Sequence, residues 1–251
     1  MTRTRKTVIV LLDVATVFAI LAAWQSLGPI SALTISTPAE VAVSLGQWST
    51  NPYLLGNIGV TLWESFAGLV LALAVAIILA FALTTSRVLI DFVAPFVSVL
   101  NAVPKVALAP LFLVVFGIGT ESKIYFIAAS IFFIPFFSMY RALTSIDPVY
   151  EDNIRALGGG RWWLVRDVKV PAIIATTIAS LRVTVAFALT GAIVSELISS
   201  QSGIGYQISQ AQNALQPAML VASVLVVVVL ALVMDLLLRL LERRFSTWRL
   251  A

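Results

Sequence analysis

Six long apolar windows set the strongest constraint on how this chain can fold. They run Val8–Leu27, Ile58–Thr84, Phe92–Phe116, Ile124–Tyr140, Ile173–Ile198 and Ala218–Leu241. Crossing about 30 Å of hydrocarbon takes about 20 residues at 1.5 Å per residue, and each window has about that length. Backbone polar groups inside a bilayer need hydrogen bonds within their own segment, so each window has to be a helix. The sequence therefore predicts an all-α polytopic membrane protein with six transmembrane helices.

The composition agrees with this prediction. Of 251 residues, 60% are apolar and only 11% are charged, whereas roughly 25% are charged in an average globular protein. Arg3, Arg5 and Lys6 precede the first window, as they would in a signal peptide. That window is long and lacks a small-residue cleavage site, so we interpret it as a retained span. We expect residues 1–251 to form a single transmembrane domain.

The basic residues predict the orientation of the chain. With a cytoplasmic N-terminus and six alternating spans, the cytoplasmic segments carry 13 of the 16 Lys and Arg residues. The outer loops carry only Lys123, while Lys105 and Arg182 fall inside spans. An excess of this kind follows the positive-inside rule, so we expect both termini in the cytoplasm. The same alternation favours an orientation signal over a nucleic-acid-binding patch.

Several kinds of chemistry are absent from the sequence. The chain has no Cys and no His, which excludes disulfides, Cys/His zinc sites and the His-dependent nucleophilic arrangements. It also lacks a phosphate-binding GxxxxGK[ST] loop and a GxGxxG fingerprint. We expect neither a catalytic residue nor a cofactor in this chain.

One polar island interrupts the apolar sequence at residues 145–171. We predict a helix over Asp147–Leu157, begun by Asp147-Pro148 and ended by Gly158, and a second short helix up to Pro171. Two short amphipathic helices at the membrane face are suited to docking another protein. The alternative is that Trp162, Trp163 and the neighbouring Arg residues only anchor the chain at the lipid interface.

The island resembles the "EAA" cytoplasmic loop of permease subunits of ATP-binding-cassette importers. Gly158 is followed by nine residues and then by Val168, Lys169, Val170 and Pro171, which matches the glycine-to-proline spacing of that loop. Further resemblance to the sulfonate, taurine, nitrate, bicarbonate and thiamine-precursor branch lies in "VPKVALAPLFLVVFGIG", "SLRVTVAFALTGAIVSEL", "GIGYQI" and "LERRFSTW". The Glu-Ala-Ala core departs from the pattern, because it reads Asp152-Asn153-Ile154 with Glu151 one place early.

The resemblance implies a MetI-like permease fold, with a core over about residues 58–241 and a cytoplasmic coupling loop over residues 145–171. It implies a permease homodimer in the bacterial inner membrane, two ATPase subunits and a periplasmic or lipid-anchored substrate-binding protein. The implied substrate is a small anion such as a sulfonate, taurine, nitrate or bicarbonate, or alternatively a thiamine-pyrimidine or other vitamin precursor. The residues implied in ATPase coupling are Glu151, Asp152, Arg155, Ala156, Leu157, Gly158 and Pro171.

Polar residues inside spans are candidates for the translocation path, because each is costly in lipid and needs protein or water around it. Prolines inside a span are candidates too, because Pro104 and Pro110 each interrupt the helix of the third window and free a carbonyl that protein or water has to satisfy. These candidates are Asn101, Pro104, Lys105, Arg182 and Glu64. Arg182 either lines the route or forms a structural pair with Glu64 or with a backbone carbonyl, and we favour the structural pair. We interpret Asp235 and Arg239 as a local i, i+4 ion pair, and Ala72, Ala76 and Ala80 as a helix-packing surface.

Two functions of other classes compete with the importer permease. An ion-coupled secondary carrier would need titratable groups at mid-membrane and no dock for an ATPase. An intramembrane enzyme would need a nucleophile beside a base, and the Ser, Asp and Glu residues are too scattered to place one. The most specific motif of the chain lies outside the bilayer, which favours the permease.

Overall fold

The computed structural model describes residues 36–84, 103–198 and 200–245, together with scattered positions between 12 and 26 and between 92 and 99. Every regular element in this part of the chain is helical. The α-helices are α2 (Pro38–Thr50), α3 (Pro52–Leu83), α5 (Ala109–Phe116), α6 (Thr120–Ile131), α7 (Phe133–Thr144), α8 (Pro148–Ala156), α9 (Arg161–Leu164), α10 (Val170–Ile198), α11 (Ile204–Asn213) and α12 (Pro217–Phe245). A 3₁₀ turn, Lys105–Leu108, precedes α5, and a π turn, Val165–Lys169, joins α9 to α10.

Three helices are long and apolar enough to cross a membrane, namely Pro52–Leu83, Arg161–Ile198 and Pro217–Leu240. They confirm the second, fifth and sixth predicted spans. A fourth span is formed if α6 and α7 count as one, although they meet at an angle of 41°. Only scattered positions of the first predicted span are described, and these are helical, while much of the third span, including Asn101, lies outside the described residues.

Proline explains the bend between α6 and α7. Pro135 is the third residue of α7 and has no N–H to donate to the carbonyl of Ile131, the last residue of α6. The proline ring also crowds the carbonyl four residues before it, which kinks a helix at this point. The predicted span Ile124–Tyr140 therefore corresponds to a bent pair of helices, and the "FFIPFF" stretch is the sequence signal for the bend.

The described part of the third predicted span is also broken. Pro104 caps the 3₁₀ turn, and Pro110 lies at the start of α5, where a missing N–H costs little. Gly117 ends α5 with a φ of 81°. The prolines thus begin short elements here, whereas the sequence had predicted that they interrupt one long helix.

Small residues let α3, α6 and α10 pack closely at the centre of the molecule. Ala72, Ala76 and Ala80 are 1% exposed or less, which confirms the predicted packing surface. One turn earlier, a Cβ added to Gly68 would lie 2.5 Å from Ile127 Cγ2, so the α6 side chain fills the space above the glycine. Gly191 of α10 faces the same Ile127 side chain from the other side.

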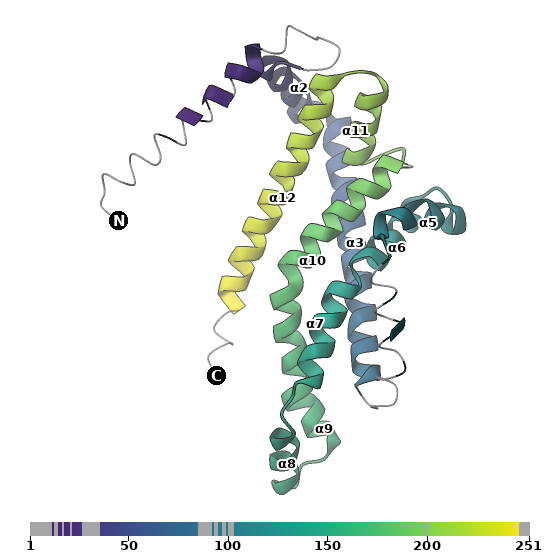
Figure 1. The fold of residues 1–251 in the computed structure, drawn as a ribbon, viewed down its shortest axis with the longest axis vertical. Coiled ribbons are helices and arrows are strands. Elements are labelled where there is room, and N and C mark those ends of the chain that lie inside the picture. The colour runs from purple at the N-terminus through teal and green to yellow at the C-terminus, as the bar shows by residue number, and fades with distance from the viewer. Residues whose placement is uncertain are drawn as a thin grey trace.

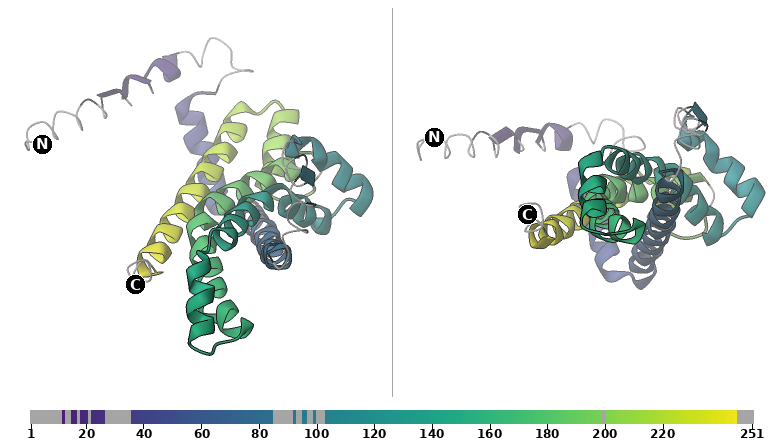
Figure 2. Two further views of the ribbon diagram at one scale, coloured as in Figure 1. Left: turned by 60° about the horizontal axis from the view of Figure 1, so that its bottom comes forward. Right: turned by 90° about the horizontal axis from the view of Figure 1, so that it is seen from below.

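The two ends of the bundle differ in character (Figure 1). At one end, α8 and α9 extend beyond the ends of α3 and α12, as Figure 2 also shows. At the other end, α2 and α11 pack against α12 around Val41, Trp48 and Ile204. The protruding end and the packed end hold the two candidate sites.

Candidate functional site

The first candidate site is the hairpin formed by α8 and α9. Asp147 caps α8 by accepting a hydrogen bond of 2.9 Å from the Val149 N–H. At the other end, Gly159 N–H donates to the Ile154 carbonyl and Gly158 N–H to the Arg155 carbonyl, at 2.8 and 3.0 Å. These two bonds form a Schellman motif, and Gly158 has the positive φ, 78°, that the motif needs. The predicted helix and its glycine end are confirmed.

The surface of α8 is almost entirely exposed, and the helix has no buried residue. Val149, Tyr150 and Leu157 are exposed by 56%, 57% and 88%. Trp162 and Trp163 of α9 are exposed as well. The hairpin therefore presents apolar side chains that no described part of this chain covers.

The coupling residues implied by the resemblance gather on this hairpin. Glu151 and Arg155 form an ion pair one helical turn apart, at 2.5 Å. Asp152 and Ala156 are exposed on the same helix, and Leu157 and Gly158 form its end. Only Pro171 lies elsewhere, in the first turn of α10.

The junction with α10 corrects the prediction for Pro171. A turn was predicted there, but the helix runs without interruption from Arg161 to Ile198. The π turn just before the proline explains this, because Val170 N–H donates to the Val165 carbonyl, five residues back. The wider turn accommodates a residue that has no N–H of its own. The hairpin is thus joined to a span through a helix.

The second candidate site is a buried polar cluster at the packed end. Lys123 Nζ lies 2.7 Å from Glu64 Oε1, and the two side chains are 5% and 0% exposed. The same ammonium donates to Ser200 Oγ at 2.7 Å. The cluster thus joins α3, α6 and the loop before α11.

This pair overturns two expectations. Lys123 was expected in an outer loop, but it belongs to the first turn of α6 and is buried. Glu64 was expected to pair with Arg182. The two residues lie on faces that point to different neighbours, because Glu64 faces α6 and Arg182 faces α12.

Arg182 instead binds two acids of α12. Its Nη2 is 2.6 Å from Glu242 Oε2, and its Nε is 3.2 Å from Asp235 Oδ1. Asp235 also pairs with Arg239 at 2.6 Å, as predicted, so it bridges two arginines. The structural role predicted for Arg182 is supported, with a different partner.

Lys105 is the other described candidate for the path. Its ammonium lies 5.5 Å from the centroid of the Phe133 ring of α7, within the range of a cation–π contact. Glu64 and Arg182 therefore have different partners, Lys123 on α6 and two acids on α12.

Three residues of the polar cluster were not singled out from the sequence, namely Asn57, Thr61 and Glu196. Glu196 is 1% exposed and accepts hydrogen bonds from Thr61 Oγ1 and from the Gly205 N–H. The available signal was an acidic residue inside an otherwise apolar span, the same signal that marked Glu64.

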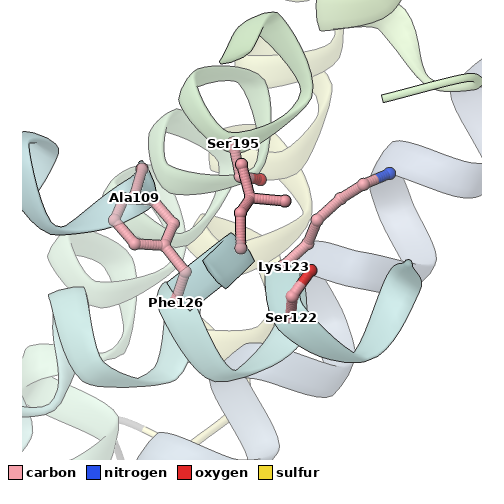
Figure 3. A pocket seen from close by; sticks show the side chains of 6 residues that line it. Ala109, Ser122, Lys123, Phe126 and Ser195 are labelled. Carbon is pink, nitrogen blue, oxygen red and sulfur yellow. The ribbon is translucent and has the colours of Figure 1, made fainter. Parts of the chain in front are cut away.

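A small hollow of about 10 Å³, enough for about one water molecule, lies beside this cluster. Figure 3 shows Lys123 extending away from Phe126 and Ala109, so its methylene stem lines the hollow while its ammonium binds Glu64 and Ser200. Ser122 and Ser195 contribute hydroxyls, both of which donate to carbonyls of their own helices or turns. The hollow is therefore mainly apolar.

Taken together, the described residues define a helical membrane protein with an exposed helical hairpin joined directly to one of its spans. Comparison with known proteins names its family. Residues 68–247 match the family "Binding-protein-dependent transport system inner membrane component", and the chain belongs to this family. It is thus a permease subunit of an ATP-binding-cassette importer of the inner membrane, and ATP hydrolysis takes place in a separate subunit.

Curated relatives place the chain in the sulfonate and taurine branch. It is 27% identical over 233 residues to the putative aliphatic sulfonates transport permease protein SsuC of Bacillus subtilis (strain 168), covering 92% of this chain and 84% of the relative. It is 26% identical to the taurine transport system permease protein TauC of Escherichia coli (strain K12), covering 95% and 90%. A riboflavin transport system permease protein, RibX of Chloroflexus aurantiacus, is 30% identical over 62% of this chain and 58% of the relative.

Solved structures confirm the MetI-like fold. An amino acid ABC transporter crystallised with histidines aligns with a TM-score of 0.64 at 17% identity, over 80% of this chain and 97% of that one. The inward-facing methionine transporter MetNI aligns with a TM-score of 0.62 at 16% identity, over 77% and 94%. Family and fold together decide against an ion-coupled secondary carrier and an intramembrane enzyme.

Proposed function

We propose that this permease forms the translocation path as a homodimer and that its α8–α9 hairpin docks on the ATPase subunits. Two ATPase subunits and a substrate-binding protein on the outer side complete the machine. Closure of the ATPases on ATP moves each hairpin as a rigid body, and α10 carries this movement into the bilayer. Both termini are cytoplasmic in this arrangement.

The observation that carries the proposal is the exposed apolar surface of α8. A helix in water buries an apolar face against something, because each fully buried large apolar side chain contributes about 1.5–3 kcal/mol. Tyr150 belongs to α8 and Leu157 caps its end, and both side chains are exposed. Figure 1 shows α8 beyond the packed bundle, at its extreme end. A partner protein at that end would cover them.

The connection to α10 makes the hairpin suitable for transmitting movement. The Schellman motif fixes the end of α8, and a continuous helix runs from Arg161 into the membrane. A displacement of α8 would therefore reach α10 through the capped turn at Gly158 and the helix that begins at Arg161. These segments leave no long flexible linker between α8 and the span.

The proposed substrate is a small anion of the sulfonate or taurine type. The support is similarity to the SsuC and TauC permeases over nearly the whole chain. Similarity to RibX supports the alternative, import of a vitamin or vitamin precursor by the same kind of machine. Binding measurements on the substrate-binding protein with taurine, an alkanesulfonate, nitrate, bicarbonate and riboflavin would separate the two.

Copurification tests the dock. Tagged permease extracted from the native membrane should retain an ATP-binding-cassette ATPase, and Asp152→Lys should lose most of it, because the charge at the dock is reversed. Glu121→Lys, a charge reversal at the opposite end of the bundle, is the matched control and should retain the ATPase. If Asp152→Lys retains all of the ATPase and uptake is unchanged, the hairpin is not the dock and serves only as an anchor at the lipid interface.

A further inference from the structure

The first turn of α11 is capped by side chains from other helices. A helix leaves its first N–H groups without intrahelical partners. Here Gly203 N–H donates to Asn57 Oδ1 at 2.8 Å, Ile204 N–H to Thr61 Oγ1 at 2.9 Å, and Gly205 N–H to Glu196 Oε2 at 2.7 Å. Gly203 has no side chain to serve as a local cap, so α3 and α10 supply the caps.

Glu196 is the central acceptor of this arrangement. Its Oε2 takes the Gly205 N–H, and its Oε1 takes the Thr61 hydroxyl at 2.8 Å. Thr61 in turn accepts from Ile204, so one buried carboxyl and one hydroxyl join three helices. We call these residues, Asn57, Thr61 and Glu196, the α11 clasp.

The backbone at the start of α11 packs so closely against Glu196 and its helix that a side chain would not fit there. A Cβ added to Gly203 would fall 2.2 Å from the Glu196 carboxyl carbon, and one added to Gly205 would fall 2.5 Å from the Ile193 carbonyl oxygen. Gly203 also has a φ of 104°, which favours glycine. Any larger residue at either position would push the start of α11 away from α10.

The partners of Glu196 require a hydrogen-bond acceptor. The two hydrogen bonds that it accepts come from neutral donors, the Thr61 hydroxyl and the Gly205 N–H. The buried cation of the cluster, Lys123, is paired with Glu64. An uncharged acceptor of the same shape can therefore take the place of the carboxyl group.

We propose that Glu196 is a positioning residue, which holds the first turn of α11 on α3 through accepted hydrogen bonds and makes α3, α10 and α11 move as one body. A second tie acts on the same segment, because Lys123 donates to Ser200 in the loop just before α11. The role of this rigid unit in substrate import rests on the function proposed above. The existence of the clasp does not depend on that function.

Glutamine should replace Glu196, since its amide oxygen can accept the Gly205 N–H. Thr61 can then turn its hydroxyl to the Asn57 carbonyl, 3.1 Å away, and accept from the new amide group with its second lone pair. Alanine at position 196 leaves the Gly205 N–H without its acceptor and removes the hydrogen bond that links Glu196 to Thr61. Thr61→Val removes the bonds of the Thr61 hydroxyl to Glu196 and to the Ile204 N–H with little change of shape, and Thr61→Ser keeps them.

Thiol labelling tests the clasp without reference to transport. The natural chain has no cysteine, so Ile204→Cys provides a single thiol at a position that is 0% exposed. Its reaction with a maleimide is followed in opened membranes, where the reagent reaches both faces. Gln201→Cys, in the exposed part of the loop, is the control and should react at one rate in every background.

We expect Ile204→Cys to label slowly when position 196 is Glu or Gln and when position 61 is Thr or Ser. With Glu196→Ala or Thr61→Val we expect labelling at least about fivefold faster, the effect of losing one buried hydrogen bond. Protection that persists in both variants would overturn the clasp. Fast labelling in Glu196→Gln would show that the charge is required and would overturn the hydrogen-bonding role.

Uptake by the complete transporter is the second readout. Glu196→Ala and Thr61→Val should lower uptake while the ATPase still copurifies, and Glu196→Gln and Thr61→Ser should restore it. If the native chain binds no ATPase, the proposed function fails while the labelling result still decides the clasp. If Glu196→Gln loses uptake while Ile204→Cys still labels slowly, the charge of Glu196 takes part in transport itself. That result would contradict the proposal.

Discussion

At the residue scale, a buried charged side chain requires a partner of opposite charge close to it. A charged group near mid-membrane costs about 2.5–3.5 kcal/mol on insertion scales, so Glu64 needs a cation. From the sequence we named Glu64 as a possible partner of Arg182, and we placed Lys123 in an outer loop. The structure selects Lys123, because α6 begins early enough to place that side chain against α3.

The Glu64–Lys123 pair should be strongly coupled. Lys123→Met leaves a buried acid without its cation and should cost about 3–5 kcal/mol, whereas Lys123→Met with Glu64→Gln should recover much of the loss. Thermal unfolding of the purified permease measures all three variants. Additive losses in the double variant would contradict the pairing.

Arg182 should behave differently, because it is 41% exposed and has two acidic partners. Arg182→Gln should cost no more than about 1 kcal/mol, the range for exposed ion pairs. Adding Glu64→Gln should not restore stability, since that residue has another partner. Recovery in this double variant would revive the original pairing.

At the element scale, the α8–α9 hairpin depends on how α8 ends. Gly158→Val places a β-branched side chain at a positive φ, which costs about 1–2 kcal/mol. We expect the end of α8 to move, with reduced ATPase binding and uptake and normal membrane insertion. Gly160→Val is the matched control, because Gly160 has a φ of −97° and open space at its Cβ. Equal effects in both variants would remove the special role of Gly158.

Local signals in the sequence predicted elements better than contacts between them. Apolar length predicted α3, α10 and α12, and the spacing of Asp147 and Gly158 predicted both ends of α8. The passage of a helix through Pro171 was not predicted, because a π turn depends on the packing of its neighbours. The α11 clasp was missed for a similar reason, since its three acceptors come from helices that the sequence could not place side by side.

At the scale of the whole molecule, the two ends should face opposite sides of the membrane. A cysteine at Gln201, near α11, should react with an impermeant reagent added outside intact cells, because the basic residues predict an outer position for that loop. A cysteine at Gly160 should react only after the membrane is opened. Since the natural chain has no cysteine, each signal comes from one site, and the reverse pattern would contradict the orientation.

The central claim is that this chain is the membrane path of an ATP-driven importer, coupled through its α8–α9 hairpin. The most direct measurement is substrate uptake into proteoliposomes that contain the permease, its ATPase and its binding protein. The account predicts accumulation that requires ATP on the side of the hairpin and is lost in Asp152→Lys but kept in Glu121→Lys. Accumulation that an ion gradient drives in the absence of ATP would contradict the account. Equal rates of uptake in Asp152→Lys and Glu121→Lys would also contradict it.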